Sequence, residues 1–230
     1  FSFCQDKIIT TGGEGGMLVL KDPDVYRKAW SFKDHGKNFD KYNKVLAHPL
    51  VDEERSRESS FYSSIGTNWR MTEIQAAIGR VALSKLDSWN IKRRREYAQM
   101  LNEGLQGIEG IKLTIPPEHI FHPYYKYYCF LDLDKMKSKW TRERVIEAIS
   151  AEGVVCQYGS TWGIACEQAW SNVDVITGEN WNLRKSSHFK NDEKLGSSAL
   201  MFQVHPTLEI VHIEATVKAV RKVMQDVIKG

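Results

Sequence analysis

The sequence contains no long apolar run, no closely spaced pair of cysteines and no strong excess of one charge. Its apolar stretches fall short of the roughly 20 residues that span a membrane, and no basic segment with an apolar core begins the chain. The four cysteines form no CxxC pair, so buried free thiols are expected rather than a zinc site or a disulfide framework. A net charge of +3 with mixed signs gives no basic footprint for nucleic acid. We therefore expect a cytoplasmic globular protein with no metal, no membrane contact and no nucleic-acid partner.

The most distinctive stretch is a lysine followed by a dense group of glycines. Lys7 lies six residues before Gly13, and four glycines surround Glu14 in the segment 12–16. Such a density predicts a strand, a tight turn and a second strand, which would fix the position of Lys7. The segment is neither a dinucleotide fingerprint, because Leu18 replaces the third glycine, nor a P-loop, because no Gly-Lys-Ser/Thr follows. From local chemistry alone, a glycine hairpin with a solvated lysine remains the alternative.

Two segments resemble those of one enzyme family. Ser-x-x-x-x-Lys at residues 2–7, followed by Gly-Glu-Gly-Gly, resembles the cofactor-lysine segment of the DegT/StrS-type nucleotide-sugar aminotransferases. Gly-Thr-Asn-Trp-Arg-Met-Thr-Glu-Ile-Gln-Ala-Ala at residues 66–77 resembles a second block of the same family. The resemblance implies a pyridoxal-phosphate enzyme with the α/β architecture of fold type I. It also implies that this chain is the C-terminal part of such an enzyme, without its N-terminal cofactor-binding part.

The resemblance assigns roles to five residues. Lys7 would form the Schiff base with pyridoxal phosphate and then move the proton of the amino donor, while Ser2 would contact the cofactor phosphate. Asn68 would reach across a homodimer interface to the partner's cofactor phosphate, so that each active site is shared between two chains. Arg70 would bind the donor's carboxylate, which suits a guanidinium that can engage both oxygens. His205, in a segment that resembles one near the sugar, would contact the substrate.

Each role has a structural alternative. Ser2 could satisfy the end of its own strand, Arg70 could form a surface ion pair, and a lone histidine such as His205 is more often structural. The basic cluster 92–95 is expected on a solvated helix face rather than at a phosphate site. The tyrosines between residues 124 and 128 are expected in strand packing rather than in a sugar-stacking platform.

Capping signals and periodicity predict the other elements. Thr72 and Gln75 form a capping box at the start of a long helix that would run to about residue 105, with a break or bend near 88–90. Asp22 precedes a second helix start, and residues 35–66 predict a long polar connection. The other expected strands are at 17–20, 124–133, 154–158 and 199–205, and the other expected helices are at 25–32, 142–151, 192–196 and 209–228.

The 230 residues would divide into two parts. We expect residues 1–105 to form the C-terminal part of the large cofactor-binding domain with a long interdomain helix, and residues 106–230 to form a small C-terminal α/β domain. The segment from Tyr158 to Asn191 is expected to set substrate choice.

The expected reaction is the transfer of an amino group from an L-amino acid, glutamate in the first instance, to a nucleotide-linked keto-deoxy sugar. Its product would enter cell-surface polysaccharide or a glycosylated metabolite. One alternative is a dehydratase of the same fold, but some relatives that dehydrate carry histidine where this chain has Lys7. The other alternative is a non-catalytic interaction domain that retains Lys7 by descent.

Overall fold

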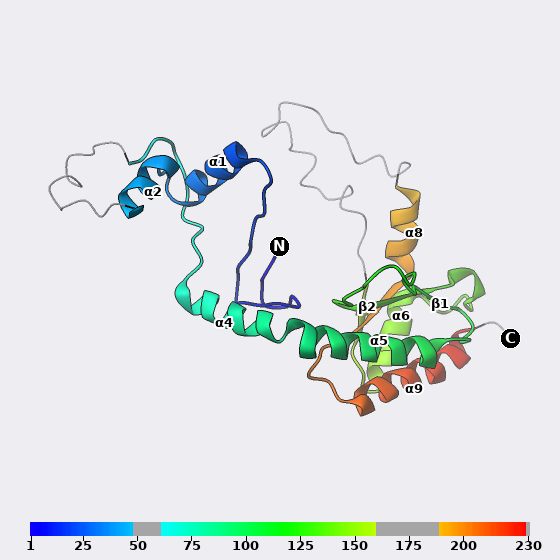
Figure 1. Ribbon diagram of the computed structural model, residues 1–230. Coiled ribbons are helices and arrows are strands. Elements are labelled where there is room, and N and C mark those ends of the chain that lie inside the picture. Colours follow the sequence, from blue (N-terminus) through cyan, green and yellow to red (C-terminus); the bar gives the residue numbers. More distant parts are fainter. Residues whose placement is uncertain (48–60, 160–188, 229–230) are drawn as a thin grey trace. The chain divides into compact units, whose positions relative to one another are not determined.

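The computed structural model describes residues 1–47, 61–159 and 189–228 (Figure 1). They fall into two compact units, Phe1–Leu86 and Asp87–Gly230. Cys166 and most of the segment expected to set substrate choice lie outside the described residues. Within the described part, no helix is long and apolar enough to cross a membrane.

The first unit begins with an extended segment and the glycine turn. A single antiparallel bridge joins Ser2 to Gly16, and the backbones of Phe1 and Met17 exchange hydrogen bonds of 2.7 and 3.0 Å. The predicted strand at 17–20 is wrong, because the pairing stops after this bridge and the following side chains stay exposed. A strand needs a neighbouring backbone along several residues, and apolar composition alone does not supply one.

Helix α1 (Pro23–Lys33) begins as predicted. The Asp22 carboxylate accepts hydrogen bonds from the amides of Asp24 and Val25, and Pro23 occupies the first turn, where its missing N–H costs nothing.

Helix α2 (Phe39–Ala47) lies where the sequence predicted only a polar connection, so that prediction is wrong for this stretch. The Trp30 ring of α1 packs against Phe39 and Tyr42, with ring centroids 5.1 and 5.3 Å apart. Packing of this kind stabilises a short helix whose own propensity is insufficient, and the local sequence does not reveal it.

The predicted long helix is present, with an irregular middle. Helix α4 (Glu73–Ser84) and helix α5 (Lys92–Leu105) are separated by a turn and the π-helical segment η1 (Leu86–Ile91). The predicted break near 88–90 is confirmed, because it falls inside η1. The boundary between the two units also lies within this segment. The capping box is confirmed as well: the Thr72 hydroxyl accepts from the Gln75 amide, and the Gln75 side chain accepts from the Thr72 amide.

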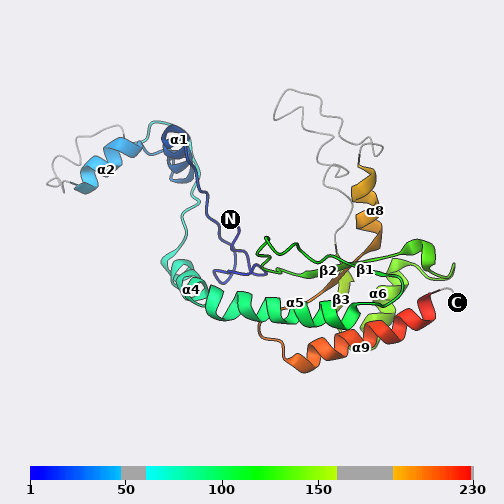
Figure 2. The ribbon, with the colours of Figure 1, turned by 45° about the vertical axis from the view of Figure 1, so that its right-hand side comes forward.

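The second unit is built on a four-stranded antiparallel sheet in the order β1-β2-β4-β3 (Figures 1 and 2). The strands are β1 (Ile111–Leu113), β2 (Tyr127–Leu131), β3 (Cys156–Tyr158) and β4 (Ala199–Phe202). Three were predicted and are confirmed over shorter spans. Strand β1 was not predicted, because three residues are too few to show a period of two.

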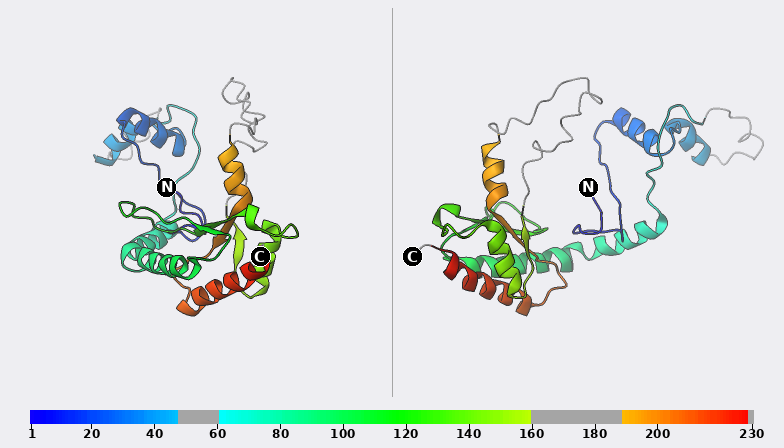
Figure 3. Two further views of the ribbon diagram at one scale, coloured as in Figure 1. Left: turned by 90° about the vertical axis from the view of Figure 1, so that its right-hand side faces the viewer. Right: turned by 180° about the vertical axis from the view of Figure 1, so that it is seen from behind.

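Helices surround this sheet. They are η2 (Leu133–Lys135), α6 (Arg142–Ala151), α8 (Lys190–Ser198) and α9 (Ile210–Val227), in addition to α5. Helices α5 and α9 run side by side in every view, and α8 lies on the opposite side of the sheet from α9 (Figures 1, 2 and 3). The predicted bounds of α6 are confirmed residue for residue, with Thr141 as its N-cap.

The hydrophobic core lies between the sheet and helices α5, α6 and α9. Alternate residues of β2 are buried, as a strand with one core face requires. The Tyr127 hydroxyl enters this core and donates to the Asn102 side chain at 2.8 Å, which satisfies both buried polar groups. Core side chains with at most 2% exposure include Tyr97, Leu101, Leu105, Val145, Ile149, Leu200, Phe202, Ile213 and Met224.

The prediction of buried free thiols is confirmed for two of the three described cysteines. Cys129 and Cys156 are buried free thiols, and Cys4 is a partly buried one. Burial raises the pKa of Cys129 strongly and that of Cys156 to about 12, so neither is a reactive thiolate at neutral pH.

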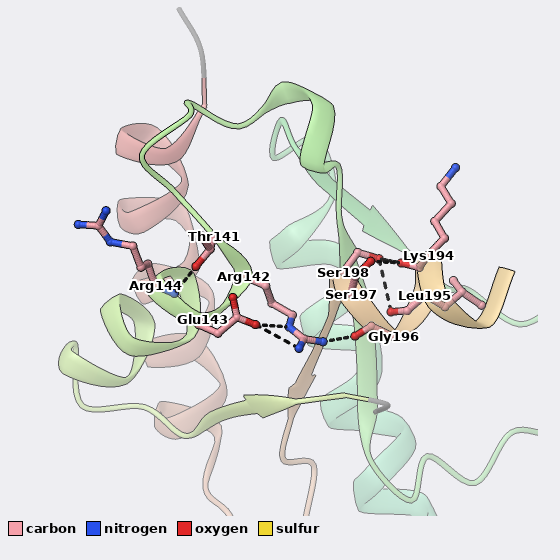
Figure 4. Close-up of polar contacts among 9 residues, drawn as sticks. All are labelled: Thr141, Arg142, Glu143, Arg144, Lys194, Leu195, Gly196, Ser197 and Ser198. Atoms are coloured by element: carbon pink, nitrogen blue, oxygen red, sulfur yellow. Dashed lines mark hydrogen bonds and ion pairs between the residues drawn. The ribbon is translucent and has the colours of Figure 1, made fainter. Parts of the chain in front are cut away.

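The Arg142 side chain connects the start of α6 to the end of α8 (Figure 4). Its guanidinium donates to the Gly196 carbonyl oxygen and to the Glu143 carboxylate, and it lies 4.7 Å from the centre of the Tyr158 ring. The start of α6, the end of β3 and the last turn of α8 are therefore held together by one side chain.

Replacement of Thr72 by Ala should destabilise the first unit by about 1 kcal/mol, because one amide of the first turn of α4 loses its acceptor. Thr72→Ser keeps the hydroxyl and is the control. Urea unfolding of both variants, followed by helical circular dichroism, checks this expectation, and equal midpoints for the two would contradict it.

Candidate functional site

Lys7 lies in a turn that main-chain hydrogen bonds hold in place. Its amide donates to the Cys4 carbonyl at 3.1 Å, and the Phe3 amide donates to the Gly15 carbonyl at 2.8 Å. The Lys7 side chain is 37% exposed, with Nζ 3.6 Å from an Asp6 carboxylate oxygen that also accepts from the Cys4 thiol at 3.0 Å. The amine is thus partly accessible and lies beside an acid.

Two of the glycines after Lys7, Gly12 and Gly15, lie in close contact with neighbouring side chains. A Cβ added at Gly12, where φ is +78°, would lie 2.9 Å from Cδ1 of Ile78, and one at Gly15 would lie 2.5 Å from the Thr11 hydroxyl. Thr11 is buried, and its hydroxyl lies within hydrogen-bond distance of the carbonyl oxygens of Phe3 and Glu14. The turn therefore packs against helix α4 at Gly12 and against Thr11 at Gly15, whereas a side chain at Gly13 would meet nothing within 4 Å.

Gln75 links this turn to the second family-like segment. Its side-chain nitrogen donates to the Glu14 carbonyl at 2.6 Å, while its oxygen caps α4. Asn68 and Arg70 immediately precede that cap, so the two segments that were matched separately in the sequence are hydrogen-bonded neighbours in the structure.

Asn68 and Arg70 are in direct contact with each other. The Arg70 Nε donates to the Asn68 side-chain oxygen at 3.0 Å and lies 3.6 Å from a carboxylate oxygen of Asp34. The ion pair considered as an alternative for Arg70 therefore exists, although its acid is buried. The Arg70 side chain is still 48% exposed, which leaves it accessible to a ligand.

Asp34 was not singled out in the sequence. It belongs to an Asp-His-Gly run after α1 in which His35 and Gly36 have φ angles of +60° and +78°. The available sequence signal was the glycine two residues after Asp34, because a glycine shortly after a helix commonly adopts the positive φ that ends it.

A pocket of about 1150 Å³ lies in the first unit. Aromatic side chains contribute much of its lining, together with the charged groups of Lys33, Asp34 and Arg70. Trp30, Phe32 and Trp69 are among those aromatics, so an apolar surface and a cationic edge meet in one cavity.

Ser2 has an exposed side chain, and its hydroxyl accepts from the Cys4 amide at 3.5 Å, the limit of a hydrogen bond. Because the Ser2 oxygen is the acceptor in this contact, the hydroxyl proton remains available to donate to a phosphate oxygen. The role of Ser2 toward the cofactor stays a prediction.

His205 lies in the second unit, directly after β4. Its Nδ1 is 2.7 Å from the Thr207 hydroxyl and accepts from the Thr207 amide at 3.3 Å. Partial burial and then the nearby Arg94 cation lower the pKa of His205 below its ordinary 6.5. The neutral ring, with its Nε2 proton, can donate a hydrogen bond to a hydroxyl.

The prediction for the basic cluster 92–95 is wrong for Arg94, which is 3% exposed. Its guanidinium donates to the Asn90 side chain at 2.7 Å and to the Tyr125 carbonyl at 2.8 Å. Carbonyl oxygens distant in sequence supply the acceptors that allow this burial. Among the described residues, no group of three or more histidines, cysteines or acids is arranged to hold a metal ion.

The sequence matches the profile of the DegT/DnrJ/EryC1/StrS aminotransferase family over residues 1–221. The chain belongs to this family. A protein of unassigned function from Methanocaldococcus jannaschii is 25% identical over 98% of this chain and 53% of its own length. The dTDP-3-amino-3,4,6-trideoxy-alpha-D-glucose transaminase of Streptomyces venezuelae is 32% identical over 53% of this chain and 28% of its own length. GDP-perosamine synthase of Escherichia coli O157:H7 is 32% identical over 54% of this chain and 29% of its own length.

The fold agrees with this assignment. An aminotransferase from Psychrobacter cryohalolentis superimposes with a TM-score of 0.78 at 36% identity, covering 98% of this chain and 55% of that one. A sugar aminotransferase from Streptococcus pneumoniae, in its PLP-form, shares the fold at 16% identity with a TM-score of 0.72, over 100% of this chain and 52% of that one. The fold-type-I α/β architecture inferred from the sequence is therefore confirmed, and the chain spans about half the length of these two structures.

Replacement of Gly36 by Ala should destabilise the first unit by more than the 1–2 kcal/mol that positive φ alone costs. An added Cβ would lie 1.6 Å from the Ser64 carbonyl oxygen. Gly107→Ala is the matched control, because φ is +76° there and nothing lies within 4 Å of the added Cβ. Hydrogen–deuterium exchange in residues 61–70 should accelerate only in the Gly36 variant. Unchanged exchange in that variant would contradict the expectation.

Proposed function

We propose that the complete protein carrying this chain is a pyridoxal-phosphate-dependent sugar aminotransferase. It transfers an amino group from an L-amino acid, with glutamate the first donor to test, to the keto carbon of a nucleotide-linked keto-deoxy sugar. The observation that supports this most directly is the placement of Lys7 in a turn that Gln75 fixes to the segment containing Asn68 and Arg70. The two relatives named as sugar enzymes support the substrate class.

The residues present fit the cofactor. Lys7 offers a partly exposed amine for the aldehyde carbon, and Ser2 offers an exposed hydroxyl for the phosphate. Pyridoxal phosphate, when bound, supplies the sink for the electron pair left as the donor loses its α-proton. Lys7 takes that proton on its amine and later returns one, for which it must be unprotonated at the start of each transfer.

The other residues bind and orient. Arg70 binds the donor's carboxylate through its exposed guanidinium, and Asn68 contributes to the cofactor phosphate of a second chain, so the active form is a homodimer with shared sites. His205, neutral at physiological pH, donates a hydrogen bond to the sugar. Residues 1–105, with the long interdomain helix, are the part from the large domain and residues 106–230 the small domain, although the α5 end of that helix packs in the core of the second unit. The enzyme works in the cytoplasm, and its product enters polysaccharide or a glycosylated metabolite.

The decisive experiment maps the cofactor lysine. We expect the full-length protein incubated with pyridoxal phosphate to absorb in the near-visible range and, after borohydride reduction, to carry the cofactor on Lys7. Lys7→Arg should lose both signals, whereas Lys21→Arg, a control lysine outside the turn, should retain them. A folded full-length protein without an adduct on Lys7 would favour the non-catalytic alternative. An adduct with sugar turnover in the absence of any amino donor would favour a dehydratase.

Arg70→Lys should lower kcat/KM for the amino donor about tenfold, or ~1.4 kcal/mol, because a lysine cannot bind a carboxylate in bidentate fashion. The kcat/KM for the sugar should not change. Arg80→Lys, an exposed arginine on α4, is the control. Steady-state kinetics with each substrate varied in turn provide the measurement, and equal losses for donor and sugar would argue against a donor-specific role.

A further inference from the structure

The carboxylate of Asp34 is buried among three cations. Lys37 Nζ lies 3.1 Å and Arg70 Nε 3.6 Å from its Oδ1, and Lys33 Nζ lies 4.0 Å from its Oδ2. Only 4% of the residue is exposed. Burial alone would raise the pKa of Asp34, but Lys37, Arg70 and Lys33 outweigh it and hold the pKa below 3.8. The acid is therefore ionised at neutral pH and needs its cationic partners.

The backbone around Asp34 is joined to the strand-like segment that carries Asn68 and Arg70. Asp34 and Asn68 form an antiparallel bridge. On either side of it, the Thr67 amide donates to the Phe32 carbonyl at 2.7 Å and the Trp69 amide donates to the Lys33 carbonyl at 2.9 Å. The position of Asp34 relative to Arg70 is thus set by main-chain hydrogen bonds as well as by charge.

The guanidinium of Arg70 is held along one edge. Its Nε contacts both Asn68 and Asp34, and its Nη2 lies 3.4 Å from the His35 ring nitrogen Nε2. Nearly half of the side chain is exposed, and it lines the pocket of the first unit. One edge of the guanidinium is therefore held by its neighbours while the rest of it is exposed. An arginine that is preorganised to bind an anion requires this arrangement.

We propose that Asp34 is a positioning residue that orients Arg70 for the carboxylate of the amino donor, an inference that rests on the function proposed above for Arg70. An arginine side chain loses rotamer entropy when it is fixed in one orientation. Because Asp34 and Asn68 fix the guanidinium before the ligand arrives, ligand binding loses little further side-chain entropy. Three cations surround one carboxylate, so the cluster has a net positive charge that attracts a second anion.

The test is a double-mutant cycle in the full-length protein. Asp34→Asn keeps the shape but removes the charge, and should lower kcat/KM for the donor about tenfold while kcat/KM for the sugar and the Lys7 adduct stay at wild-type levels. In an Arg70→Lys background the same change should cost less than about twofold, because coupled residues are not additive. Asp40→Asn is the matched control, since Asp40 is an exposed acid 3.5 Å from Arg27.

A second measurement reports on Arg70 without turnover. The proton on Nε of Arg70, assigned by its disappearance in Arg70→Lys, should exchange with solvent about tenfold faster in Asp34→Asn than in the wild type when followed by nitrogen-15 NMR. If Asp34→Asn is insoluble, Asp34→Glu retains the charge on a longer side chain and should shift both measurements in the same direction by less.

Three results would overturn the inference. They are unchanged exchange at Arg70 in the Asp34 variant, additive losses in the cycle, and a parallel fall of the donor and sugar values with a lower melting temperature, which would indicate a merely structural role. A failure of the proposed function can be distinguished from a failure of the inference about Asp34. A wild-type protein that forms the Lys7 adduct without transaminating refutes the function, and the exchange of the Arg70 proton then decides the role of Asp34 by itself.

Discussion

The side-chain amide of Gln75 is the group on which the first unit depends most. Its oxygen closes the capping box of α4, and its nitrogen holds the carbonyl of Glu14 in the glycine turn. Lys7 precedes that turn and Arg70 precedes that helix, so one amide sets the relative position of both. Glutamate at this position could still cap the helix, but it would lose the donor. The proposed active site therefore relies on a residue to which no role toward substrate or cofactor is assigned.

Close backbone contacts, rather than apolar burial, define the geometry around the site. Gly12 allows the turn to lie against Ile78, and Gly36 allows the end of α1 to meet the Ser64 carbonyl. At such distances, main-chain hydrogen bonds and short polar side chains determine where functional groups lie. The second unit is organised differently, because a buried sheet and three helices share a continuous apolar core there.

Elements with a local signal were predictable from the sequence, and those that depend on distant partners were not. Thr72 and Thr141 cap helices whose starts were correctly placed. Helix α2 was missed because it depends on packing against Trp30, and the burial of Arg94 was missed because its carbonyl acceptors lie about thirty residues away. The same limit applies to the site. Lys7, Asn68 and Arg70 were named from family-like segments, whereas Asp34 becomes a candidate only once the fold brings it to Arg70.

The two units differ in how their helices are supported. Among the described residues, α1 and α4 contain no buried side chain, whereas α9 buries seven. Local opening of α4 exposes little new apolar surface, while α9 cannot open without exposing the core of its unit. In a protein made of residues 1–230 alone, amides around Lys7 and Arg70 should therefore exchange faster than those beside His205, which lies between the buried residues Val204 and Pro206. The two units would then behave as separate cooperative folding units.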